Sequence, residues 1–447
     1  MSDETDSFLH FFFACRKRFK KMTQEEFQRY QLKKAKEIVQ YSVRNSPYFK
    51  KYFSGYNLDD VWNLPITNKK LMMDNFTEYN TLGFEKQELI DFCLRIEQEQ
   101  NYNERFKGYN VAMSSGTSGN KGIVLTSPKE EKYLQAVFFA RFPFPKILRL
   151  KWAFILRVTT PAFQVSKFGQ RLTHFSLQLP LEDMRNKLQK FDPNILSAPP
   201  SMLKILANEV KEGRLKIKPK RLVSYAEVLH PEIKIEIEEA FKTKVHQIYQ
   251  GSEGSIALTC KHCKLHINED LLFVQLFDKK DNPIEPGKPS HKMIVTDLHK
   301  KSQPIIRFEL NDVITLSSEK CSCGSSFRVI DQIMGRVDDV FWATRKDSGE
   351  LQYIFPDYIR RAIISSSEEI DEYQVIQKSF TKIIVRIQTK EYSKENQELI
   401  SNIQKNLISV FENYKCPTPK IDIRFEKPQR NPNSLKLIRI QRDFKIT

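Results

Sequence analysis

The feature that most constrains the fold is the regular alternation of short apolar segments with helical segments between residues 150 and 250. Patterns typical of buried strands lie at 152–158, 195–197, 221–224 and 244–249, and helical patterns lie between them at 181–191, 202–211 and 231–241. Strands that alternate with helices form a mainly parallel sheet covered by helices. Ligands of such sheets bind at the carboxyl ends of the strands. The sequence therefore predicts an α/β fold with its site at that edge.

The chain beyond residue 267 shows two other patterns. Strand segments without intervening helices, at 271–277, 292–296 and 313–316, predict an antiparallel subdomain. Beyond Gly335 the predicted order is strand 339–344, helix 356–366, strands 373–377 and 382–388, helix 394–413 and strand 420–425. This order is typical of a small α+β unit. We therefore expect an N-terminal domain over residues 1–336 and a C-terminal domain over residues 337–447.

Composition excludes several classes of protein. The 447 residues include 72 Lys and Arg against 55 Asp and Glu, a net charge of +17, but the two signs are interleaved along the chain. Because the sequence has no arginine-rich tract and no zinc-finger helix, we expect no nucleic-acid partner, and the excess charge suits small anionic substrates. Seven cysteines, an odd number, argue against a secreted disulfide framework.

The N-terminal segment is first aromatic and then basic. The apolar run at 8–15 is too short to span a bilayer, which takes about 20 residues. The basic residues at 16–21 follow this run, whereas those of a signal peptide precede it. We expect a helix that packs on the body, with a membrane-surface anchor as the alternative, in a cytoplasmic protein without stable membrane insertion. Thr23 and Glu26 form a capping-box pattern that predicts the start of the next helix.

The strongest motif is a loop rich in glycine and hydroxyl groups between apolar segments at 111–113 and 123–125. Its residues are Ser114, Ser115, Gly116, Thr117, Ser118, Gly119, Asn120, Lys121 and Gly122. Backbone N–H and side-chain O–H donors in such a loop can surround phosphate oxygens, and Lys121 adds a positive charge. A hairpin turn is the alternative, but it needs only two or three of these residues. We therefore expect phosphate binding here.

This loop resembles the Ser-Ser-Gly-Thr-Thr-Gly signature of the adenylate-forming superfamily, with Ser118 in place of the second threonine. Within that superfamily the chain is most similar to the phenylacetate–CoA ligase branch and to the synthetases that adenylylate the deazaflavin coenzyme. The resemblance continues through most of the chain in the family's order. It implies ATP as a substrate, Mg²⁺ as a cofactor and a C-terminal domain that acts as a mobile lid.

Two downstream motifs resemble the nucleotide-binding elements of the superfamily. The run Tyr249-Gln250-Gly251-Ser252-Glu253 is similar to the Tyr-x-x-Thr/Ser-Glu element, whose glutamate helps hold Mg²⁺ on the phosphates. A carboxylate is a hard oxygen ligand suited to that ion. The resemblance also places Tyr249 and Gln250 beside the adenine and the acyl group. The segment 304–312 resembles Pro-Leu-Ile-Arg-Tyr-x-x-x-Asp, and Asp312 would accept hydrogen bonds from both ribose hydroxyls.

Two further motifs imply residues that act during catalysis. The segment 335–339 matches the family's Gly-Arg-x-Asp-Asp hinge, which implies that Arg336 contacts ribose or phosphate and that the lid turns about Asp338. The segment 433–440 resembles the Ser/Glu-Gly-Lys-x-x-Arg element, whose lysine bridges the acyl carboxylate and the α-phosphate. Lys436 is the candidate, although Leu435 replaces the family's glycine and a surface lysine is the alternative.

Two segments that follow predicted strands resemble the walls of the acyl pocket in this branch. They are Pro199-Pro200-Ser201 and Ser224-Tyr225-Ala226-Glu227. Their position after strands supports this interpretation, because the loops that leave parallel strands carry the ligand contacts. Glu227 can equally be the acid at the start of a helix.

Soft metal ligands gather in two clusters about 55 residues apart. The first cluster contains Cys260, His262, Cys263 and His266, and the second contains Cys321 and Cys323, which gives five or six potential ligands. This is what a tetrahedral structural zinc site requires, with buried unliganded thiols as the alternative. The related synthetases carry a Cys…Leu-His knuckle and a Cys-x-Cys-Gly knuckle at these places. The resemblance therefore implies Cys260, His266, Cys321 and Cys323 as ligands, with Cys263 as an alternative to His266, in a subdomain over about 255–330.

The resemblance implies an ATP-dependent ligase that activates a carboxylic acid as acyl-AMP and transfers the acyl group to a thiol. We expect an aryl or arylacetic acid as the substrate and coenzyme A as the thiol. The same first step could lead instead to an amine or a carrier protein as acceptor, or AMP could pass to a hydroxylated coenzyme. The non-enzymatic alternative is a zinc-stabilised nucleic-acid-binding protein. A homodimer is compatible with the sequence.

Overall fold

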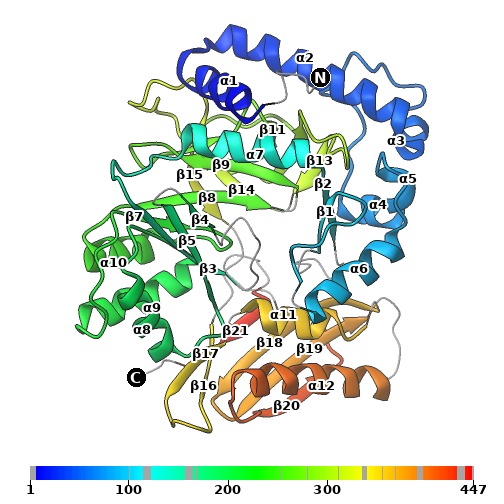
Figure 1. The fold of residues 1–447 in the computed structure, drawn as a ribbon. Helices are drawn as coiled ribbons and strands as arrows, with labels where there is room; N and C mark the ends of the chain where they lie inside the picture. Colours follow the sequence, from blue (N-terminus) through cyan, green and yellow to red (C-terminus); the bar gives the residue numbers. More distant parts are fainter. Residues whose placement is uncertain are drawn as a thin grey trace.

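The computed structural model describes residues 7–99, 101–113, 122–156, 165–167, 170–251, 253–278, 280–310, 312–334, 340–354, 356–367, 369–389, 396–429 and 438–444. A large α/β body and a smaller C-terminal α+β unit lie on either side of a central cavity (Figure 1). Among the described residues, none of the helices combines the length and the hydropathy that a bilayer span needs.

The body is built on a ten-stranded mixed sheet with the strand order β14-β15-β10-β9-β8-β7-β6-β3-β5-β4. Its strands are β3 (Leu150–Leu156), β4 (Val165–Lys167), β5 (Gln170–Ser176), β6 (Ile195–Ala198), β7 (Arg221–Ser224), β8 (Val245–Gly251), β9 (Gly254–Thr259), β10 (Leu265–Ile267), β14 (Val313–Leu316) and β15 (Val329–Met334). The neighbours β5, β3, β6, β7 and β8 are parallel, and antiparallel strands continue the sheet on both sides. The predicted parallel sheet is confirmed.

The helices that connect the parallel strands begin and end close to the predicted residues. They are α8 (Leu181–Phe191), α9 (Pro200–Lys211) and α10 (Pro231–Phe241). Proline in the first turn of α9 and of α10 fixes their starts, because its ring presets a helical φ where no N–H partner is needed. Left-handed residues, Asp192 with φ 49° and Lys242 with φ 53°, end α8 and α10.

The antiparallel strands after residue 267 are present, but they belong to two sheets. The strands β11 (Leu272–Phe277), β12 (Lys292–Asp297) and β13 (Phe308–Leu310) form a separate three-stranded sheet. In contrast, β14 pairs with β15 and extends the ten-stranded sheet. The expected subdomain is thus divided, because β14 finds its partner in β15, a strand that the sequence patterns did not reveal.

The N-terminal third is mainly helical and covers one side of the body (Figure 1). Its elements are α1 (Phe8–Lys21), α2 (Gln24–Asn45), α3 (Pro47–Tyr52), α4 (Lys69–Asp74), α5 (Phe76–Tyr79), α6 (Lys86–Gln98), β1 (Asn110–Met113), β2 (Ile123–Thr126) and α7 (Pro128–Arg141). The aromatic helix α1 packs along α7, with the Phe11 and Tyr133 rings edge to face at 5.0 Å. The predicted capping box at Thr23 and Glu26 is confirmed at the start of α2.

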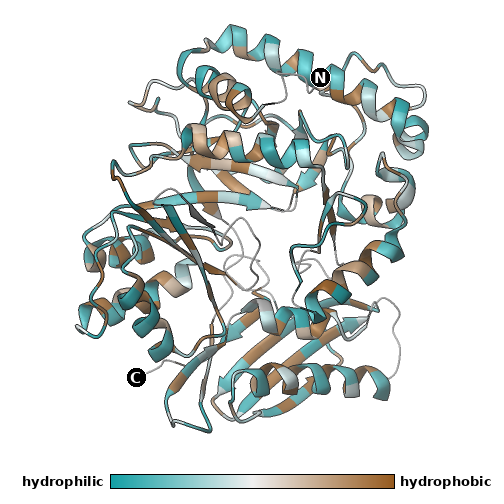
Figure 2. Cartoon of the chain, viewed as in Figure 1, coloured by the Kyte–Doolittle hydropathy of each residue, from teal (hydrophilic) through white to brown (hydrophobic). Residues whose placement is uncertain are grey.

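The C-terminal unit has its own hydrophobic core, built from residues between Phe341 and Ile440. Its elements are β16 (Phe341–Thr344), β17 (Leu351–Ile354), α11 (Pro356–Ile364), β18 (Ile370–Ser379), β19 (Lys382–Thr389), α12 (Gln397–Asn413), β20 (Lys420–Arg424) and β21 (Ile440–Arg442). A four-stranded sheet has the order β20-β19-β18-β21. Hydrophilic and hydrophobic residues alternate along α12, which buries its apolar side in this core (Figure 2).

Candidate active site

A cavity of about 2190 Å³ lies at the carboxyl edge of the parallel strands, between the body and the C-terminal unit. Pro199, Tyr225 and Glu253 line it, and each follows one of the strands β6, β7 and β8. From the opposite side the C-terminal unit contributes Trp342 and Arg439. The site edge predicted from the sequence is therefore the edge at which the cavity opens.

A tyrosine and an aspartate from two neighbouring motifs meet in the cavity wall. The Tyr249 hydroxyl at the end of β8 donates a hydrogen bond of 2.7 Å to Oδ2 of Asp312, which directly precedes β14. Burial, together with the negative charge of Asp312, raises the pKa of Tyr249 well above its usual value. The phenol therefore stays a neutral donor that orients the carboxylate. Both side chains line the cavity.

The turn between β8 and β9 presents Glu253 to the cavity. Its carboxylate folds back over Gly251, where an added Cβ would lie 2.8 Å from the Glu253 Oε2 atom. Gly254 has φ +152°, a conformation that residues with side chains rarely adopt. Glycine on both sides of Glu253 therefore allows the tight turn and leaves room for the carboxylate.

Two lysines, one half-buried and one buried, approach Glu253 from other parts of the body. Lys69 is the first residue of α4, and Lys300 follows β12; both line the cavity. Burial lowers the pKa of each ammonium group; the charge of Glu253 opposes this effect at Lys69, and the charges of Asp297, Glu130 and Glu253 oppose it at Lys300. The cavity therefore holds two cations and a carboxylate close together, an arrangement suited to a polyanion with a bound divalent metal.

A second part of the cavity wall is apolar. Trp152, Phe154 and Leu156 on β3 line it, together with Leu172 on β5. The Tyr225 hydroxyl, also in the wall, donates a 2.6 Å hydrogen bond to the Ile155 carbonyl oxygen and so holds the loop after β7 against β3. This part suits an apolar group.

The two segments compared with acyl-pocket walls lie against each other. The Glu227 carboxylate accepts hydrogen bonds from the Ser201 N–H at 3.1 Å and from the Ser201 hydroxyl at 2.9 Å. It therefore caps the first turn of α9, where backbone N–H groups have no partner within the helix. Glu227 is thus an acid at the start of a helix, as one interpretation of the sequence predicted. The helix that it caps is α9, which precedes it in the chain. All of Pro199–Ser201 and Ser224–Glu227 line the cavity.

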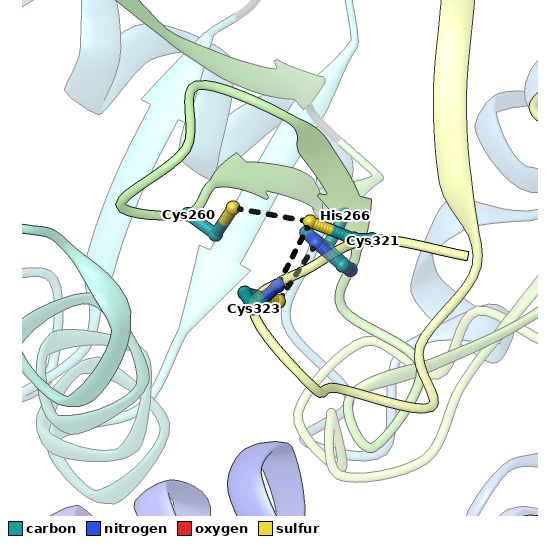
Figure 3. Close-up of side chains that lie close together, drawn as sticks. All are labelled: Cys260, His266, Cys321 and Cys323. Atoms are coloured by element: carbon teal, nitrogen blue, oxygen red, sulfur yellow. Dashed lines mark hydrogen bonds between the residues drawn. The ribbon is translucent and has the colours of Figure 1, made fainter. Parts of the chain in front are cut away.

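Away from the cavity, four metal-binding side chains converge (Figure 3). The ligand atoms of Cys260, His266, Cys321 and Cys323 all lie within 4.8 Å of one another. The Cys260 and Cys321 sulfurs are 3.7 Å apart, and the Cys323 sulfur is 3.4 Å from His266 Nε2. Tetrahedral zinc with its usual bond lengths separates two sulfurs by about 3.8 Å and a sulfur from a nitrogen by about 3.6 Å. The four residues therefore fit a zinc ion.

The residues around the cluster orient His266 and keep it neutral, which favours metal binding. His266 Nδ1 lies 2.9 Å from the Phe327 carbonyl oxygen, which fixes the ring and turns Nε2 towards the sulfurs. Burial lowers the pKa of His266, so that the imidazole stays neutral as a ligand must. Burial, with the neighbouring sulfurs, raises the pKa of Cys323 to about 12, which leaves the thiol protonated unless a cation lies beside it.

Cys263, the alternative ligand, lies apart from this cluster. Its sulfur contacts the His246 ring nitrogens at 3.8 and 3.9 Å, and its backbone adopts a positive φ of 58°. It is not among the residues whose ligand atoms converge. His266 rather than Cys263 therefore completes the group of four. The other cysteines, Cys15, Cys93 and Cys416, are buried, and Arg18 Nη2 donates a hydrogen bond of 3.1 Å to the Cys15 sulfur.

Comparisons with known proteins show which proteins are similar to this chain in sequence and in fold. No family model matches the chain. Over 200 residues it is 25% identical to a phenylacetate-coenzyme A ligase of Thermus thermophilus, a match that covers 42% of this chain and 43%, less than half, of that relative. A 2-hydroxyisobutyryl-CoA ligase, solved with 2-HIB-AMP and CoA in the thioesterification state, superposes with a TM-score of 0.62 at 15% identity. That superposition covers 95% of this chain and 92% of the solved one.

The chain has the fold of the adenylate-forming ligases. An open form of the same solved ligase, again with 2-HIB-AMP and CoA, superposes with a TM-score of 0.58 at 16% identity and covers 95% of this chain. The resemblance found in the sequence is thus confirmed at the level of the fold, over both the body and the C-terminal unit.

Several candidate residues of the adenylate-forming fold lie outside the described residues. They are Ser114, Ser115, Gly116, Thr117, Ser118, Gly119, Lys121, Ser252, Arg336, Asp338 and Lys436. Met113 and Arg439 both line the cavity, one at the end of β1 and the other just before β21. The roles of the undescribed residues stay predictions.

The sequence patterns missed Lys69 and Lys300. Lys69 reaches the cavity because Thr67 pairs with the chain beside β13: the Thr67 N–H donates to the Arg307 carbonyl at 2.9 Å, and the Glu309 N–H donates to the Thr67 carbonyl at 2.8 Å. This contact joins residues some 240 positions apart, and no local pattern signals it. For Lys300 the only signal was its place between a strand and the motif that contains Asp312.

Proposed function

We propose that this protein is an AMP-forming acid–thiol ligase. The supporting observation is that Tyr249, Glu253 and Asp312, which the sequence placed around a nucleotide, line one cavity together with two lysines. In the first half-reaction a carboxylate oxygen attacks the α-phosphorus of ATP, pyrophosphate leaves and acyl-AMP forms. In the second, the sulfur of a thiol attacks the acyl carbonyl carbon, the thiol proton is lost and AMP leaves.

Each described residue has a proposed part in the first step. Asp312, oriented by Tyr249, would accept hydrogen bonds from the ribose hydroxyls. Lys69 and Lys300 would attract the β- and γ-phosphates. Glu253 would hold Mg²⁺, and that ion supplies neutralising charge at the phosphate oxygens when bound. Arg336 and Lys436 keep the parts assigned by resemblance, at the ribose or phosphate and at the acyl carboxylate.

We propose an aryl or arylacetic acid as the substrate and coenzyme A as the acceptor. The apolar wall formed by Trp152, Phe154 and Leu172 supports an apolar acid, since its rings and branched side chains offer contact area and no charge. A carrier protein or an amine remains the alternative acceptor. The cysteines are free rather than disulfide-bonded, which supports a reducing compartment such as the cytoplasm.

We also propose that Cys260, His266, Cys321 and Cys323 bind a structural zinc ion. The cluster lies on a different part of the body from the cavity lining, and its residues are absent from that lining. Four protein ligands leave no open position for substrate, which is typical of a structural site. The distances between the sulfurs and to His266 Nε2 support this assignment.

A pyrophosphate-exchange screen over aryl, arylacetic and fatty acids tests the proposed activity. The full chain should incorporate labelled pyrophosphate into ATP only when its acid is present. Asp312→Ala should lower this exchange at least about a hundredfold, because two hydrogen bonds to a charged group are lost. Asp91→Ala, which removes an exposed carboxylate on α6, serves as the matched control.

Equal exchange in the wild-type chain and in Asp312→Ala would contradict the site assignment. Exchange that needs no acid, with AMP transferred to a hydroxylated coenzyme, would overturn the acid–thiol reaction. Product analysis with coenzyme A, an amine or a carrier protein as the acceptor then distinguishes the second half-reactions.

A further inference from the structure

The helix α1 presents an unusual outer face. Leu9 and Phe13 on this helix are 62% and 63% exposed, although large apolar side chains are normally buried. Phe8 stacks on Phe12 at 6.3 Å and meets the Phe139 ring of α7 at 6.0 Å, and Phe139 in turn is 42% exposed. The exposed apolar groups are therefore contiguous across two packed helices rather than scattered.

The second half of the same face is basic. Arg16, Lys17, Lys20 and Lys21 are all exposed, and none of them forms an ion pair with another described residue. At 100° per residue, Leu9, Phe13, Arg16 and Lys20 lie along one stripe of the helix. The stripe therefore changes from apolar to positively charged along its length.

We propose that this face of α1, with the adjoining end of α7, docks on an anionic lipid surface. Amphipathic helices that lie in the membrane interface combine exposed Phe and Leu with Lys and Arg, so that the apolar groups enter the acyl boundary and the cations meet the headgroups. A nucleic acid would match the four cations but would leave Leu9 and Phe13 without a partner. A negatively charged bilayer complements both halves of the stripe.

The rest of the helix holds this face outward. Arg18 Nε contacts Asp270 Oδ2 at 2.8 Å, and Arg141 of α7 pairs with the same buried carboxylate. Phe19 packs edge to face on His266 of the metal cluster at 5.4 Å. The inner side of α1 is thus fixed to the body by charge and by ring packing, and the apolar outer side is left for a partner.

Vesicle co-sedimentation of the full chain tests this proposal. Vesicles of phosphatidylcholine with about one-third phosphatidylglycerol should bind the protein, and vesicles of phosphatidylcholine alone should bind it far less. The variant Leu9→Gln/Phe13→Gln should lose at least about tenfold in partitioning, because it removes the inserted apolar groups. The variant Lys17→Glu/Lys20→Glu should lose the preference for anionic vesicles.

Matched controls lie away from α1, on α10, on the loop after α9 and on β17 of the C-terminal unit. Ile235→Gln/Leu351→Gln removes two exposed apolar side chains elsewhere, and Lys216→Glu/Lys218→Glu reverses two exposed charges; both should bind like the wild type. Circular dichroism confirms that each variant is folded. Wild-type binding that is absent, or that Leu9→Gln/Phe13→Gln leaves unchanged, would overturn the proposal. So would sedimentation as a dimer that this variant abolishes, which would assign the face to a second copy of the chain.

The position of this face also bears on how an apolar acid reaches the cavity. This inference rests on the proposed function. His10, Phe11 and Ala14 of α1 line the cavity, as do Phe138 and Phe139 of α7. An apolar acid dissolved in lipid would therefore lie close to the cavity. Leu9→Gln/Phe13→Gln should keep its pyrophosphate exchange with an acid in free solution and lose it at least about fivefold with the same acid held in anionic vesicles. Loss with both would place the defect in the ligase site instead.

Discussion

At the scale of single residues, Tyr249 and Asp312 contribute in different ways: the tyrosine orients the carboxylate, and the aspartate carries the charge. The phenol donates one hydrogen bond of 2.7 Å, while the carboxylate carries the negative charge that ribose hydroxyls would meet. We predict that Tyr249→Phe raises the KM for ATP about three- to tenfold and leaves kcat within about twofold, because one hydrogen bond of roughly 1 kcal/mol is lost. Initial rates of pyrophosphate exchange over a range of ATP concentrations measure both constants.

The contrasting variant is Asp312→Asn, which keeps the shape and removes the charge. It should lower kcat/KM for ATP more than Tyr249→Phe does, since hydrogen bonds to a charged acceptor are the stronger ones. If Tyr249→Phe instead lowered kcat alone, the tyrosine would contribute to the reaction rather than position the carboxylate.

Asp297 is a second residue with a testable effect. Burial raises the pKa of its carboxyl to about 6, although its hydrogen bonds from the His299 and Lys300 N–H groups oppose this rise. Because the folded pKa lies above the usual 3.8, the folded state holds this proton more tightly than the unfolded state. Its contribution to stability is therefore greatest below pH 4 and falls as the pH rises from 4 to 6, by about 3 kcal/mol in total.

We predict that Asp297→Asn removes this dependence on pH. The free energy of unfolding, measured by urea denaturation at pH 4 and pH 7, should fall less over this interval in the variant than in the wild type. Because an amide oxygen can still accept the two backbone hydrogen bonds, the variant should also be the more stable protein at pH 7. Parallel pH profiles for the two proteins would contradict the prediction.

At the scale of elements, the metal cluster supports the N-terminal helices. Phe19 of α1 packs on His266, and Phe27 of α2 packs on Phe327 at a ring distance of 5.0 Å. Phe19, Phe27 and Phe327 share one small hydrophobic cluster with Cys260, Cys321 and Cys323. The junction of α1 and α2 therefore packs on the segments that carry the four candidate metal ligands, and a bound metal would fix those segments relative to one another.

We predict that the wild-type chain retains one zinc ion after dialysis and that Cys321→Ser retains none, as measured by plasma mass spectrometry. The same variant should lower Tm and speed amide hydrogen exchange in α1 and α2, since metal binding and local folding are coupled. Cys263→Ser is the matched control and should retain one zinc per chain. Zinc lost from Cys263→Ser but kept in Cys321→Ser would assign the ligands differently.

The helices and strands also show how much of the fold could be predicted from the sequence. It predicted α8, α10, β7 and β14 at their observed bounds, because proline starts, helical periodicity and short apolar runs are local signals. It missed β17 and β21, which are short and find their partners in β16 and β18. A strand of three or four residues has too little periodicity to be recognised alone.

The same limit applies to the candidate site. Tyr249, Glu253 and Asp312 lie in motifs that could be compared with a family, and the structure brings them to one cavity. The spacing of the cysteines and histidines signalled a metal site, and the family resemblance selected the four residues whose ligand atoms converge. Lys69 carries no such signal, because it depends on the pairing of Thr67 with residues about 240 positions away. The part of the site that rests on long-range contacts is therefore the part that the sequence alone could not supply.

At the scale of the whole molecule, polar and apolar contacts join the C-terminal unit to the body, where Tyr353 is buried in the core formed with α8, α9 and α10. The Tyr353 hydroxyl of β17 donates a 2.8 Å hydrogen bond to the Leu179 carbonyl, and Arg361 of α11 forms an ion pair with Glu97 of α6. In this arrangement Arg439, three residues beyond Lys436, lines the cavity. The arrangement thus places Arg439, a described residue of the C-terminal unit, at the cavity that we propose to bind the nucleotide.

We predict that Tyr353→Phe/Glu97→Gln slows adenylation about three- to tenfold and leaves the transfer from preformed acyl-AMP to coenzyme A undiminished. The two lost contacts are worth about 1 kcal/mol each, and they stabilise only this orientation of the unit. Pyrophosphate exchange measures the first half-reaction, and thioester formation from added acyl-AMP measures the second. Asp347→Asn, which breaks an ion pair within the C-terminal unit, is the matched control and should change neither rate. If both half-reactions slowed equally, the contacts would support the fold of the unit rather than its orientation, and the proposed turn about Asp338 would lose its support.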